Sequence, residues 1–400
     1  MSGLEIAIAI LMLVQAVLTI QVVSNLRYAL KTFRRDRRDY LPKCLLIVPC
    51  KGIDETFERN IRSFFEQAYP SYRLWFVVDS ATDPAYGPIE TLCRELGAQS
   101  AHDTQILVAG QAEGCSQKLH NLLYACRKSP EDTEVLVFAD SDACAGPSWL
   151  SHIVHPLRQE KTGAASGYRW FVPGKNNSAS IALSAVNAKV CQLLGNTRFN
   201  LAWGGSMAIR MDRFRELGIE SIWSKSLSDD LSLSRAVQRA GLKMVFVPAC
   251  MIASYESATW SGFYEFARRQ FVITRVYAPG MWRLGLFGAS MSVFGLWGGA
   301  ALAIWQLIQD GAPNRLFILF PFYFLGCLMI RAILRQRLGA ELLPHDRENM
   351  KAARWADWLL FWLWDLVLLV IIVSSAFGNV IVWRNIRYRL HSPTKIETLH

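Results

Sequence analysis

The sequence predicts a mostly parallel α/β domain carried between membrane helices, and three features lead to this fold class. Short apolar runs alternate with helix-like stretches over residues 44–258, which is the pattern of a parallel sheet covered by helices on both faces. Apolar segments long enough to cross a bilayer stand before and after this region. The chain is 52% hydrophobic and has 14 Trp in 400 residues, which is too apolar for an ordinary soluble domain.

The first expected element is a transmembrane helix at residues 1–26, where Glu5 is the one charged residue. A basic juxtamembrane linker over residues 27–43 follows, with the cations Arg27, Lys31, Arg34, Arg35, Arg37, Arg38 and Lys43. Basic residues beside a span favour the cytoplasmic side, so we expect residue 27 onward to face the cytoplasm. A cleaved signal peptide is disfavoured, because the charges follow the apolar stretch and no small-residue cleavage site is evident.

The central domain, residues 44–258, is expected to alternate strands with helices. The apolar runs expected to form strands are residues 44–49, 74–78, 105–108 and 134–138. The stretches expected to form helices include residues 56–67, 88–96 and 230–240, the last of which is followed by Gly241. Ligands of such sheets bind beyond the carboxyl ends of the strands, so acidic residues at those ends are candidates for a site.

Beyond residue 258 the chain becomes apolar again. Residues 259–283 mix aromatic side chains with arginines, as an amphipathic helix in the membrane interface does. Residues 284–383 are expected to form about three membrane helices. The expected parts are spans at 284–308 and 316–330 around a turn at 309–314, a charged connector at 335–354, and a third apolar stretch at 358–382.

The tail, residues 384–400, begins with several basic residues, which predicts a cytoplasmic location. Four simple crossings would instead place this tail on the side away from the central domain. One apolar segment is therefore a candidate re-entrant or interfacial helix, and the sequence leaves open which one.

The net charge of +10 lies largely beside the apolar segments, which indicates contact with the anionic headgroups of a lipid bilayer. No nucleic-acid partner is expected, because the chain has no zinc-finger, aromatic RNA-binding or helix-turn-helix pattern. Nine Cys without a C-x-x-C pair indicate reduced, cytosol-facing thiols rather than a disulfide framework or a zinc site.

Asp140 and Asp142 close the strand that ends in Val137-Phe138-Ala139. Two carboxylates this close at a loop can bind a hard cation such as Mg²⁺ or Mn²⁺. Such a cation neutralises charge on a departing diphosphate. The alternative interpretation is a solvated turn, because a lone Asp-x-Asp triplet occurs often by chance.

Asp79 follows another expected strand, with Asp83 four residues later. A carboxylate at this place can hydrogen-bond a base or ribose, as acidic residues do in other nucleotide-binding sheets. The alternative is a helix cap or turn residue before Pro84, and this alternative fits Asp83 better than Asp79.

Asp229 and Asp230 follow Ser228 and open an expected helix. One interpretation is that Ser228 or Asp229 is an N-cap, with acids favoured by the helix dipole. The other interpretation makes one of the two acids a general base for an incoming hydroxyl. The cap alone does not explain why the doublet falls downstream of two other strand-end acids.

Two further stretches are candidates for ligand contacts. Lys118 and Asn121 open a helix after the third strand, where a lysine suits a phosphate; an ordinary surface helix is the alternative. Gly205 and Ser206 belong to a small-residue turn, Trp203-Gly204-Gly205-Ser206-Met207, where glycines allow close approach of a substrate. A plain turn is equally consistent with that stretch.

Four isolated polar residues remain. His152 and His155 have helical spacing but no acidic or cysteine partners for a metal set, so we interpret them as structural. Arg331 and Asp365 lie in or beside apolar segments, where charges are costly and usually functional. Snorkelling, or a pair between the two, is the alternative.

Together these stretches resemble the ceramide glucosyltransferases, a membrane branch of the inverting GT-A glycosyltransferases (glycosyltransferase families 2 and 21). The resemblance begins at Val48-Pro49-Cys50-Lys51-Gly52-Ile53-Asp54. It continues in order through residues 60–66, 79–85, 118–122, 140–142, 205–207, 229–230 and 383–390. It covers nearly the whole chain, so the combination is specific although each motif alone is weak.

The resemblance implies a multi-pass integral membrane protein whose GT-A domain faces the cytoplasm. It implies transfer of a hexose, with UDP-glucose as the expected donor, to the hydroxyl of a membrane lipid such as ceramide. Asp79 would contact the nucleotide, Asp140 and Asp142 the metal and diphosphate, and Asp230 would be the catalytic base. The other substrate-binding residues expected here are Lys118, Asn121, Asp229, Gly205, Ser206, Arg269, Gln270 and Arg275.

One departure concerns the interfacial helix, where the family carries a basic-x-x-Arg-Trp motif. Arg269 fills the first place, but Val272 and Ile273 replace the Arg-Trp pair, and Arg275 one turn away is the candidate substitute. Relatives in the superfamily glycosylate hopanoids or diacylglycerol, so these lipids and other UDP-sugars are alternatives. A polysaccharide synthase would need more spans, and a membrane transporter or scaffold would leave the three acidic stations unexplained.

Overall fold

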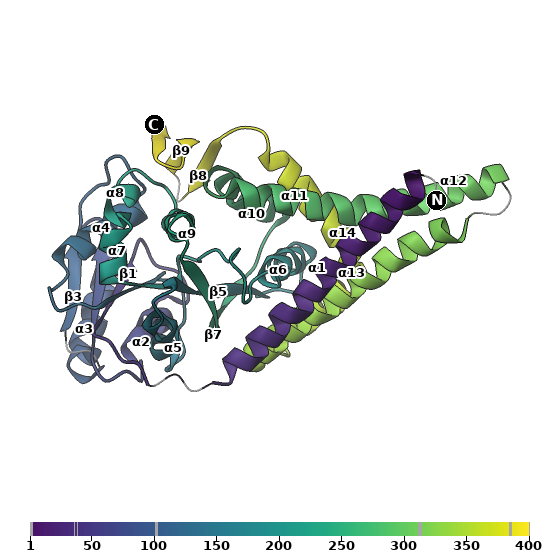
Figure 1. Ribbon diagram of the computed structural model, residues 1–400. Helices are drawn as coiled ribbons and strands as arrows, with labels where there is room; N and C mark the ends of the chain where they lie inside the picture. Colours follow the sequence, from purple (N-terminus) through teal and green to yellow (C-terminus); the bar gives the residue numbers. More distant parts are fainter. Residues whose placement is uncertain are drawn as a thin grey trace. The chain divides into compact units, whose positions relative to one another are not determined.

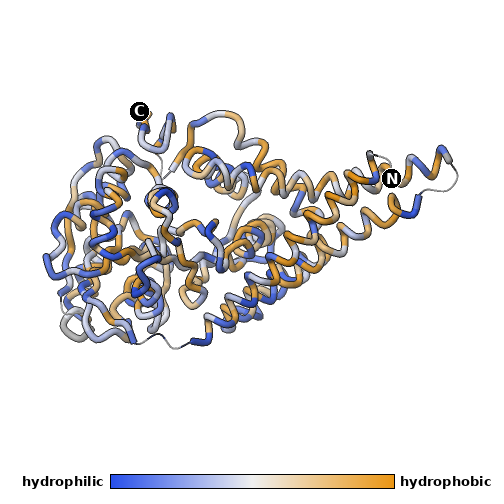
Figure 2. Tube along the Cα trace, in the orientation of Figure 1, coloured by the Kyte–Doolittle hydropathy of each residue, from blue (hydrophilic) through white to orange (hydrophobic). Residues whose placement is uncertain are grey.

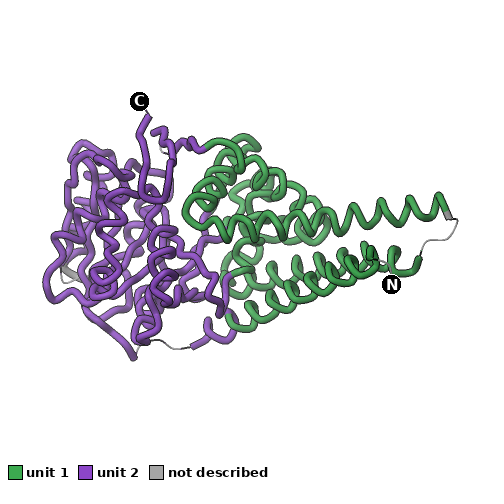
Figure 3. Tube along the Cα trace, turned by 45° about the horizontal axis from the view of Figure 1, so that its top comes forward, with its two compact units in different colours: residues 1–28, 171–193, 255–378 green, residues 29–170, 194–254, 379–400 purple. Residues whose placement is uncertain are grey.

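A computed structural model describes residues 3–35, 37, 39–100, 103–310, 314–383 and 386–399. The chain forms two compact units (Figure 3). The sheet unit comprises residues 29–170, 194–254 and 379–400, and the helical unit comprises residues 1–28, 171–193 and 255–378. Arg38, Arg384 and Asn385, as well as residues 311–313 of the expected turn, lie outside the described residues.

The sheet unit is built on a seven-stranded sheet with the order β3-β2-β1-β4-β6-β5-β7 (Figure 1). The strands are β1 (Cys44–Pro49), β2 (Tyr72–Val78), β3 (Asp103–Val108), β4 (Val135–Ala139), β5 (Thr162–Pro173), β6 (Ser206–Arg210) and β7 (Lys243–Glu256). The pairs β1/β2, β2/β3 and β1/β4 are parallel, whereas β4/β6 and β5/β6 are antiparallel. The four strands predicted from apolar runs are therefore confirmed, and they form the parallel part.

Helices cover both faces of this sheet. They are α2 (Phe57–Phe65), α3 (Tyr86–Ser100), α4 (Gln117–Lys128), α5 (Trp149–Val154) with the 3₁₀ turn η1 (His155–Arg158), α7 (Met211–Glu216), α8 (Ile219–Trp223) and α9 (Asp229–Arg239). Alternate residues of β1 enter different cores: Leu46 packs with α2, and Leu45 packs with α4. Burial on both faces explains why the strand is apolar at every position rather than at every second one.

The helical unit contains most of the apolar segments, which colour as hydrophobic along their length in Figure 2. Its helices are α1 (Gly3–Phe33), α6 (Ser178–Cys191), α10 (Trp260–Tyr277), α11 (Pro279–Val293), the π-helical turn η2 (Phe294–Gly298), α12 (Gly299–Asp310), α13 (Arg315–Leu342), the 3₁₀ turn η3 (Pro344–Asp346) and α14 (Lys351–Ser375). Within the described residues, four helices are long and apolar enough to cross a membrane: Gly3–Phe33, Pro279–Gln309, Arg315–Leu342 and Lys351–Ser375.

Several expected boundaries differ from the structure. The first helix runs on to Phe33 rather than ending at 26, because the basic residues after the apolar stretch are helix formers. The helix expected over 259–283 ends at Tyr277, and Pro279 begins the next helix at a position that tolerates proline. The expected connector at 335–354 is wrong in its first part, because α13 continues to Leu342.

The C-terminal residues form a small antiparallel sheet rather than the end of a membrane helix. Its strands are β8 (Val380–Trp383), β9 (Ile386–Ser392) and β10 (Lys395–Leu399). The apolar stretch expected at 358–382 is therefore wrong at its end, because α14 stops at Ser375 and Gly378 adopts a φ of 72° that favours glycine. This three-stranded sheet belongs to the sheet unit.

Candidate active site

The structure brings together acids from two different stations around one lysine. Asp140 follows β4, Lys118 lies in the first turn of α4, and Asp229 opens α9. The Lys118 ammonium lies 2.7 Å from Asp140 Oδ1 and 2.9 Å from Asp229 Oδ2. Serine caps start both helices: Ser116 accepts from Leu119 N and Ser228 accepts from Leu231 N.

These contacts perturb the ionisation of all three groups. Burial, opposed by Lys118, raises the pKa of Asp140, and neighbouring acids raise it further. Burial likewise raises the pKa of Asp229. The nearby carboxylates outweigh burial at Lys118 and hold the pKa of its ammonium above the usual range. Perturbed groups of this kind concentrate at functional sites.

Asp230 is held in a fixed orientation beside this cluster. Its Oδ1 accepts hydrogen bonds from the Ser228 hydroxyl and from Leu231 N at 2.7 Å, and its Oδ2 accepts one from Gly204 N at 3.2 Å. The side chain is half-buried, whereas Asp229 is only 3% exposed. The predicted cap interpretation is therefore confirmed for Ser228, and this cap leaves Asp230 directed by three donors.

Gly204 was predicted only as part of a turn, but the structure gives it a specific place. A Cβ at this position would lie 2.4 Å from Asp229 Oδ2 and 2.7 Å from Lys118 Nζ. Any larger residue would therefore displace the lysine and the acid from each other. A Trp-Gly-Gly turn before a strand is the sequence signal that marks such a close approach.

Asp142 lies on the turn after β4, and its Oδ2 is 2.7 Å from the Arg169 guanidinium. Arg169 also lies over the Trp203 ring, 5.1 Å from the centroid. Arg169 carries no sequence signal beyond being a cation within a strand, and it was not among the predicted site residues.

The Asp140 and Asp142 side chains are 25% and 34% exposed, so ligands can reach them. Within the described part of the chain, no group of three or more His, Cys, Asp or Glu side chains is arranged to hold a metal ion. Two carboxylates nevertheless fit Mg²⁺ or Mn²⁺, because such ions are commonly bound by one or two carboxylates together with substrate phosphates.

The third station, Asp79, lies beyond β2 and pairs with a lysine from the end of β1. Lys51 Nζ lies 2.8 Å from Asp79 Oδ2, and Asp79 is 8% exposed. Asp83 accepts from Gly52 N and Ala85 N, both at 2.9 Å, so the turn interpretation of Asp83 is confirmed. Lys51 was quoted only as part of a motif, and it joins the ends of two neighbouring strands.

Three residues predicted to bind substrate are instead occupied by the protein. Asn121 is 2% exposed; its amide donates to Val77 O and accepts from Gln117 Nε2. Ser206 is fully buried and accepts from Trp149 Nε1 at 2.9 Å. Gly205 is buried against the Trp203 ring. These contacts position all three residues, and their expected contacts with a substrate stay predictions.

Arg269, Gln270 and Arg275 lie on α10, in the helical unit. Arg269 lies over the Phe266 ring at 5.4 Å, and Gln270 is exposed. Arg275 donates to the carbonyls of Ala376 and Gly378 at the end of α14. This contact gives Arg275 a structural role, and the expected contacts of these residues with a donor stay predictions.

The isolated polar residues also find partners. His155 contacts Asp39 and Arg37, each at 2.8 Å, and His152 contacts Ser148 O, which agrees with their structural interpretation. The suggested pairing of Arg331 with Asp365 is wrong. Asp365 Oδ1 instead lies 2.9 Å from Lys189 Nζ on α6, and Arg331 donates to Ser292.

An open α/β sheet with acids beyond β2 and β4 is typical of α/β enzymes that bind nucleotides. Residues 5–396 match the family model described as Glycosyl transferase family 21. The chain therefore belongs to glycosyl transferase family 21, and it is a glycosyltransferase. This membership, with the sheet and the four apolar helices, confirms the predicted GT-A fold class with one N-terminal and three C-terminal candidate spans.

The chain is also similar to solved structures. The mannosyltransferase PcManGT from Pyrobaculum calidifontis, in complex with GDP-Man and Mn²⁺, is 14% identical over 92% of this chain and 97% of its own, with a TM-score of 0.48. GalNAc-T7 with UDP, GalNAc and Mn²⁺ is 12% identical over 62% and 52%, with a TM-score of 0.41. Glucosyl-3-phosphoglycerate synthase from Mycobacterium tuberculosis is 13% identical over 58% and 79%, with a TM-score of 0.37.

Proposed function

We propose that the protein transfers a hexose from a UDP-sugar, with UDP-glucose as the first candidate donor, to the hydroxyl of a membrane lipid such as ceramide. The reaction takes place at the cytosolic face of the membrane and inverts the anomeric centre. The observation that carries the proposal is the placement of Asp230, a half-buried and oriented carboxylate, beside the Lys118, Asp140 and Asp229 cluster. One such site can hold a diphosphate and deprotonate an incoming hydroxyl.

In this proposal Lys118 binds the donor diphosphate. Two of its three N–H donors face Asp140 and Asp229, which leaves the third for a phosphate oxygen. The raised pKa keeps the Lys118 ammonium charged throughout the neutral range. Asp79, paired with Lys51 at the end of β2, is placed to accept hydrogen bonds from the nucleoside.

Asp140 and Asp142 would hold the divalent cation, Mg²⁺ or Mn²⁺. A bound cation of this kind neutralises the negative charge that develops on a departing diphosphate. Without a donor, the two carboxylates pair with cations of the protein, Asp140 with Lys118 and Asp142 with Arg169.

The chemical step is a single displacement. The lipid oxygen forms a bond to the anomeric carbon from the face opposite the diphosphate, and the bond from that carbon to the phosphate oxygen breaks. UDP leaves with the electron pair, and the hydroxyl proton passes to Asp230. Oδ2 is the better acceptor, because among the described residues it accepts one hydrogen bond, from Gly204 N, whereas Oδ1 already accepts two.

The membrane-lipid acceptor is supported by the four helices that are long and apolar enough to cross a membrane. An acceptor that stays in the bilayer needs an enzyme anchored there. Hopanoid or diacylglycerol acceptors, with other UDP-sugars, remain alternatives within the same mechanism.

The test is transfer of radiolabelled sugar from UDP-glucose to extracted lipids by membranes that contain the wild type or Asp230→Asn. Loss of a general base slows a reaction by about 10²- to 10⁴-fold, so we expect at least a ~100-fold loss of single-sugar lipid product. Mass spectrometry then identifies the acceptor.

Asp212→Asn is the matched control, because Asp212 also lies in the first turn of a helix but is exposed and paired with Arg210. This variant should keep wild-type transfer. Equal transfer by Asp230→Asn and wild type would remove Asp230 as the base, and a polymeric product would favour a polysaccharide synthase.

A further inference from the structure

The C-terminal strands are part of the sheet unit. The Ser226 hydroxyl, beside the start of α9, donates to Pro393 O at 2.9 Å. Tyr388 and Leu390 are 4% and 2% exposed. The tail is thus packed into the same folded body as the candidate active site, and both lie on one side of the bilayer.

This packing restricts how often the intervening chain crosses the membrane. The chain leaves the sheet unit after Ser254 and returns to it at Asn379. A chain that leaves and returns on the same side makes an even number of crossings. The described residues between these points contain three candidate spans, namely α11 with α12, α13, and α14. One of the three therefore does not cross.

Helix α6 marks the side of the bilayer on which the sheet unit lies. The chain enters α6 from the sheet unit after Trp170 and returns to the sheet unit at Leu194. A crossing needs about 20 residues, and α6 has 14, so this excursion cannot cross and come back. Helix α6 must stay on the side of the sheet unit.

The middle of α14 is bound to α6. Lys189 Nζ lies 2.9 Å from Asp365 Oδ1, and both side chains are buried. Trp364 and Ile371 pack in one apolar cluster with Ala182 and other residues of α6. These contacts place the centre of α14 at the same depth in the membrane as α6, which does not cross the bilayer.

Both ends of α14 are bound in the same way to segments that follow directly from β7. Near its start, Asp346 Oδ1 accepts from the hydroxyl of Tyr255, which is a residue of β7, at 2.7 Å. At its end, the carbonyls of residues 376–378 accept from Arg268 and Arg275 on α10. Helix α10 begins four residues after β7, and it is not among the helices apolar enough to cross.

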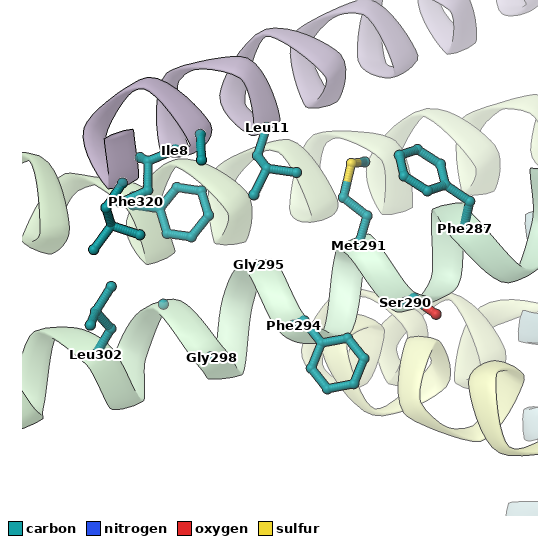
Figure 4. A pocket seen from close by; sticks show the side chains of 13 residues that line it. Ile8, Leu11, Phe287, Ser290, Met291, Phe294, Gly295, Gly298, Leu302 and Phe320 are labelled. Atoms are coloured by element: carbon teal, nitrogen blue, oxygen red, sulfur yellow. The ribbon is translucent and has the colours of Figure 1, made fainter. Parts of the chain in front are cut away.

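The other apolar helices, α1, α12 and α13, are joined to one another by polar contacts that do not involve α14. Asn314, which caps α13, donates through its side-chain amide to Glu5 of α1 at 2.9 Å and through its backbone N–H to Gln306 Oε1 of α12 at 3.0 Å. Two glycines, Gly295 and Gly299, allow close packing against α13. A Cβ at either position would lie within 2.6 Å of a phenylalanine ring of α13. An apolar pocket of about 290 Å³ lies between α1, α11, α12 and α13, and Figure 4 shows the side chains that line it.

We propose that the chain crosses the bilayer three times, through α1, α11 with α12, and α13, and that α14 is a one-leaflet helix. Its partner is the lipid leaflet on the side of the sheet unit. Its exposed apolar residues recur at helical spacing and form one lipid-facing stripe: Trp355, Leu359, Leu366, Val370 and Val373.

The dimensions of α14 agree with this arrangement. Its 25 residues extend over about 38 Å at 1.5 Å per residue, whereas one leaflet of hydrocarbon is about 15 Å thick. The helix must therefore lie close to the membrane plane, and it is interrupted at Leu360, where the backbone is not helical. Three crossings also place the basic tail in the cytoplasm, which removes the conflict between four crossings and the charge pattern.

The test uses a recognition site for a specific protease, inserted in separate variants of the full chain at four places. The places are before residue 3, between residues 310 and 314, after Glu131 in an exposed loop of the sheet unit, and after residue 399. Sealed vesicles with the inserted protein are treated with the protease, and detergent-opened vesicles give the full cleavage. Sugar transfer by each variant controls for folding.

We expect the C-terminal site to be cleaved or protected together with the site after Glu131. The sites at 310–314 and at the N-terminus should show the opposite behaviour, with an all-or-none difference. Cleavage of the C-terminal site together with the 310–314 site would show that α14 crosses, and it would overturn the proposal. The outcome does not depend on which sugar or lipid the enzyme uses.

Discussion

Two clusters of buried charge, one in each unit, differ in ways that separate a reactive site from a structural ion pair. In the sheet unit, Lys118 faces Asp140 and Asp229, with Asp230 next along the chain. In the helical unit, Arg335 pairs with Asp357 through two parallel hydrogen bonds, and Gln336 donates to the same carboxylate at 2.8 Å. The first cluster has an excess of acid, whereas the second is balanced.

The two clusters also differ in the solvent exposure of their side chains. Asp140 is 25% exposed and Lys118 is 16% exposed, whereas Arg335 and Asp357 are 1% and 0% exposed. In the buried Arg335–Asp357 pair, each charge is neutralised by its partner, so no ligand is required to stabilise it. An exposed cluster with more carboxylates than cations attracts a metal ion. The carboxylates can then bind the metal, and the lysine can bind a diphosphate. The comparison therefore predicts opposite results when one acid is removed from each cluster.

The larger effect is expected from Asp357→Asn in the helical unit. This change leaves the Arg335 guanidinium buried without its counter-charge, which typically costs about 3–5 kcal/mol. We expect a large fall in the thermal unfolding midpoint of the detergent-solubilised protein. Turnover per folded molecule should stay near that of the wild type.

The control for Asp357→Asn is the double variant Arg335→Met with Asp357→Leu, which removes both charges and should recover most of the stability. A change below about 1 kcal/mol in Asp357→Asn, the value typical of an exposed pair, would contradict the structural assignment of this pair.

The smaller effect in free energy is expected from Asp140→Asn in the sheet unit. Lys118 keeps Asp229 as a partner, and the cluster loses one of its mutually repelling acids, so stability should not fall. Turnover should fall by at least about 100-fold, equivalent to about 2.7 kcal/mol, because the proposed cation ligand is lost. Turnover measured over a range of Mn²⁺ concentrations separates lost affinity from lost rate.

Asp132→Asn is the matched surface control for that experiment, since Asp132 is exposed and paired with Lys43 and Arg73. If Asp140→Asn lost activity only in proportion to unfolded protein, the distinction between the two clusters would fail.

Much of the site could be predicted because local patterns determine it. Apolar runs marked the strands that end at Asp79 and Asp140, and a serine before two acids marked the start of α9. These signals lie within a few residues of the groups that they position. The same holds for the turn at Asp83, whose carboxylate accepts from Ala85 N two residues further on.

The partners of these residues could not be predicted, because they come from distant parts of the chain. Arg169 reaches Asp142 from β5, and Gly204 fits between Lys118 and Asp229 through three-dimensional packing. Helix α6 is buried on nearly all sides, so it has no clear amphipathic pattern, and Lys189 could not be matched to Asp365. The hydrogen-bond partners of Arg275 are set by the place where α14 ends. That place could not be predicted, because the sequence stays apolar beyond it.

The most direct measurement for the central claim is the anomeric configuration of the purified glycolipid, read from the anomeric proton coupling in its NMR spectrum. UDP-glucose carries an α-linked sugar, and a single displacement with Asp230 as the base must give a β-linked product. A β-glycoside made by the wild type is the result that we predict. An α-glycoside would contradict the mechanism, since retention requires a different route from the one built around Asp230.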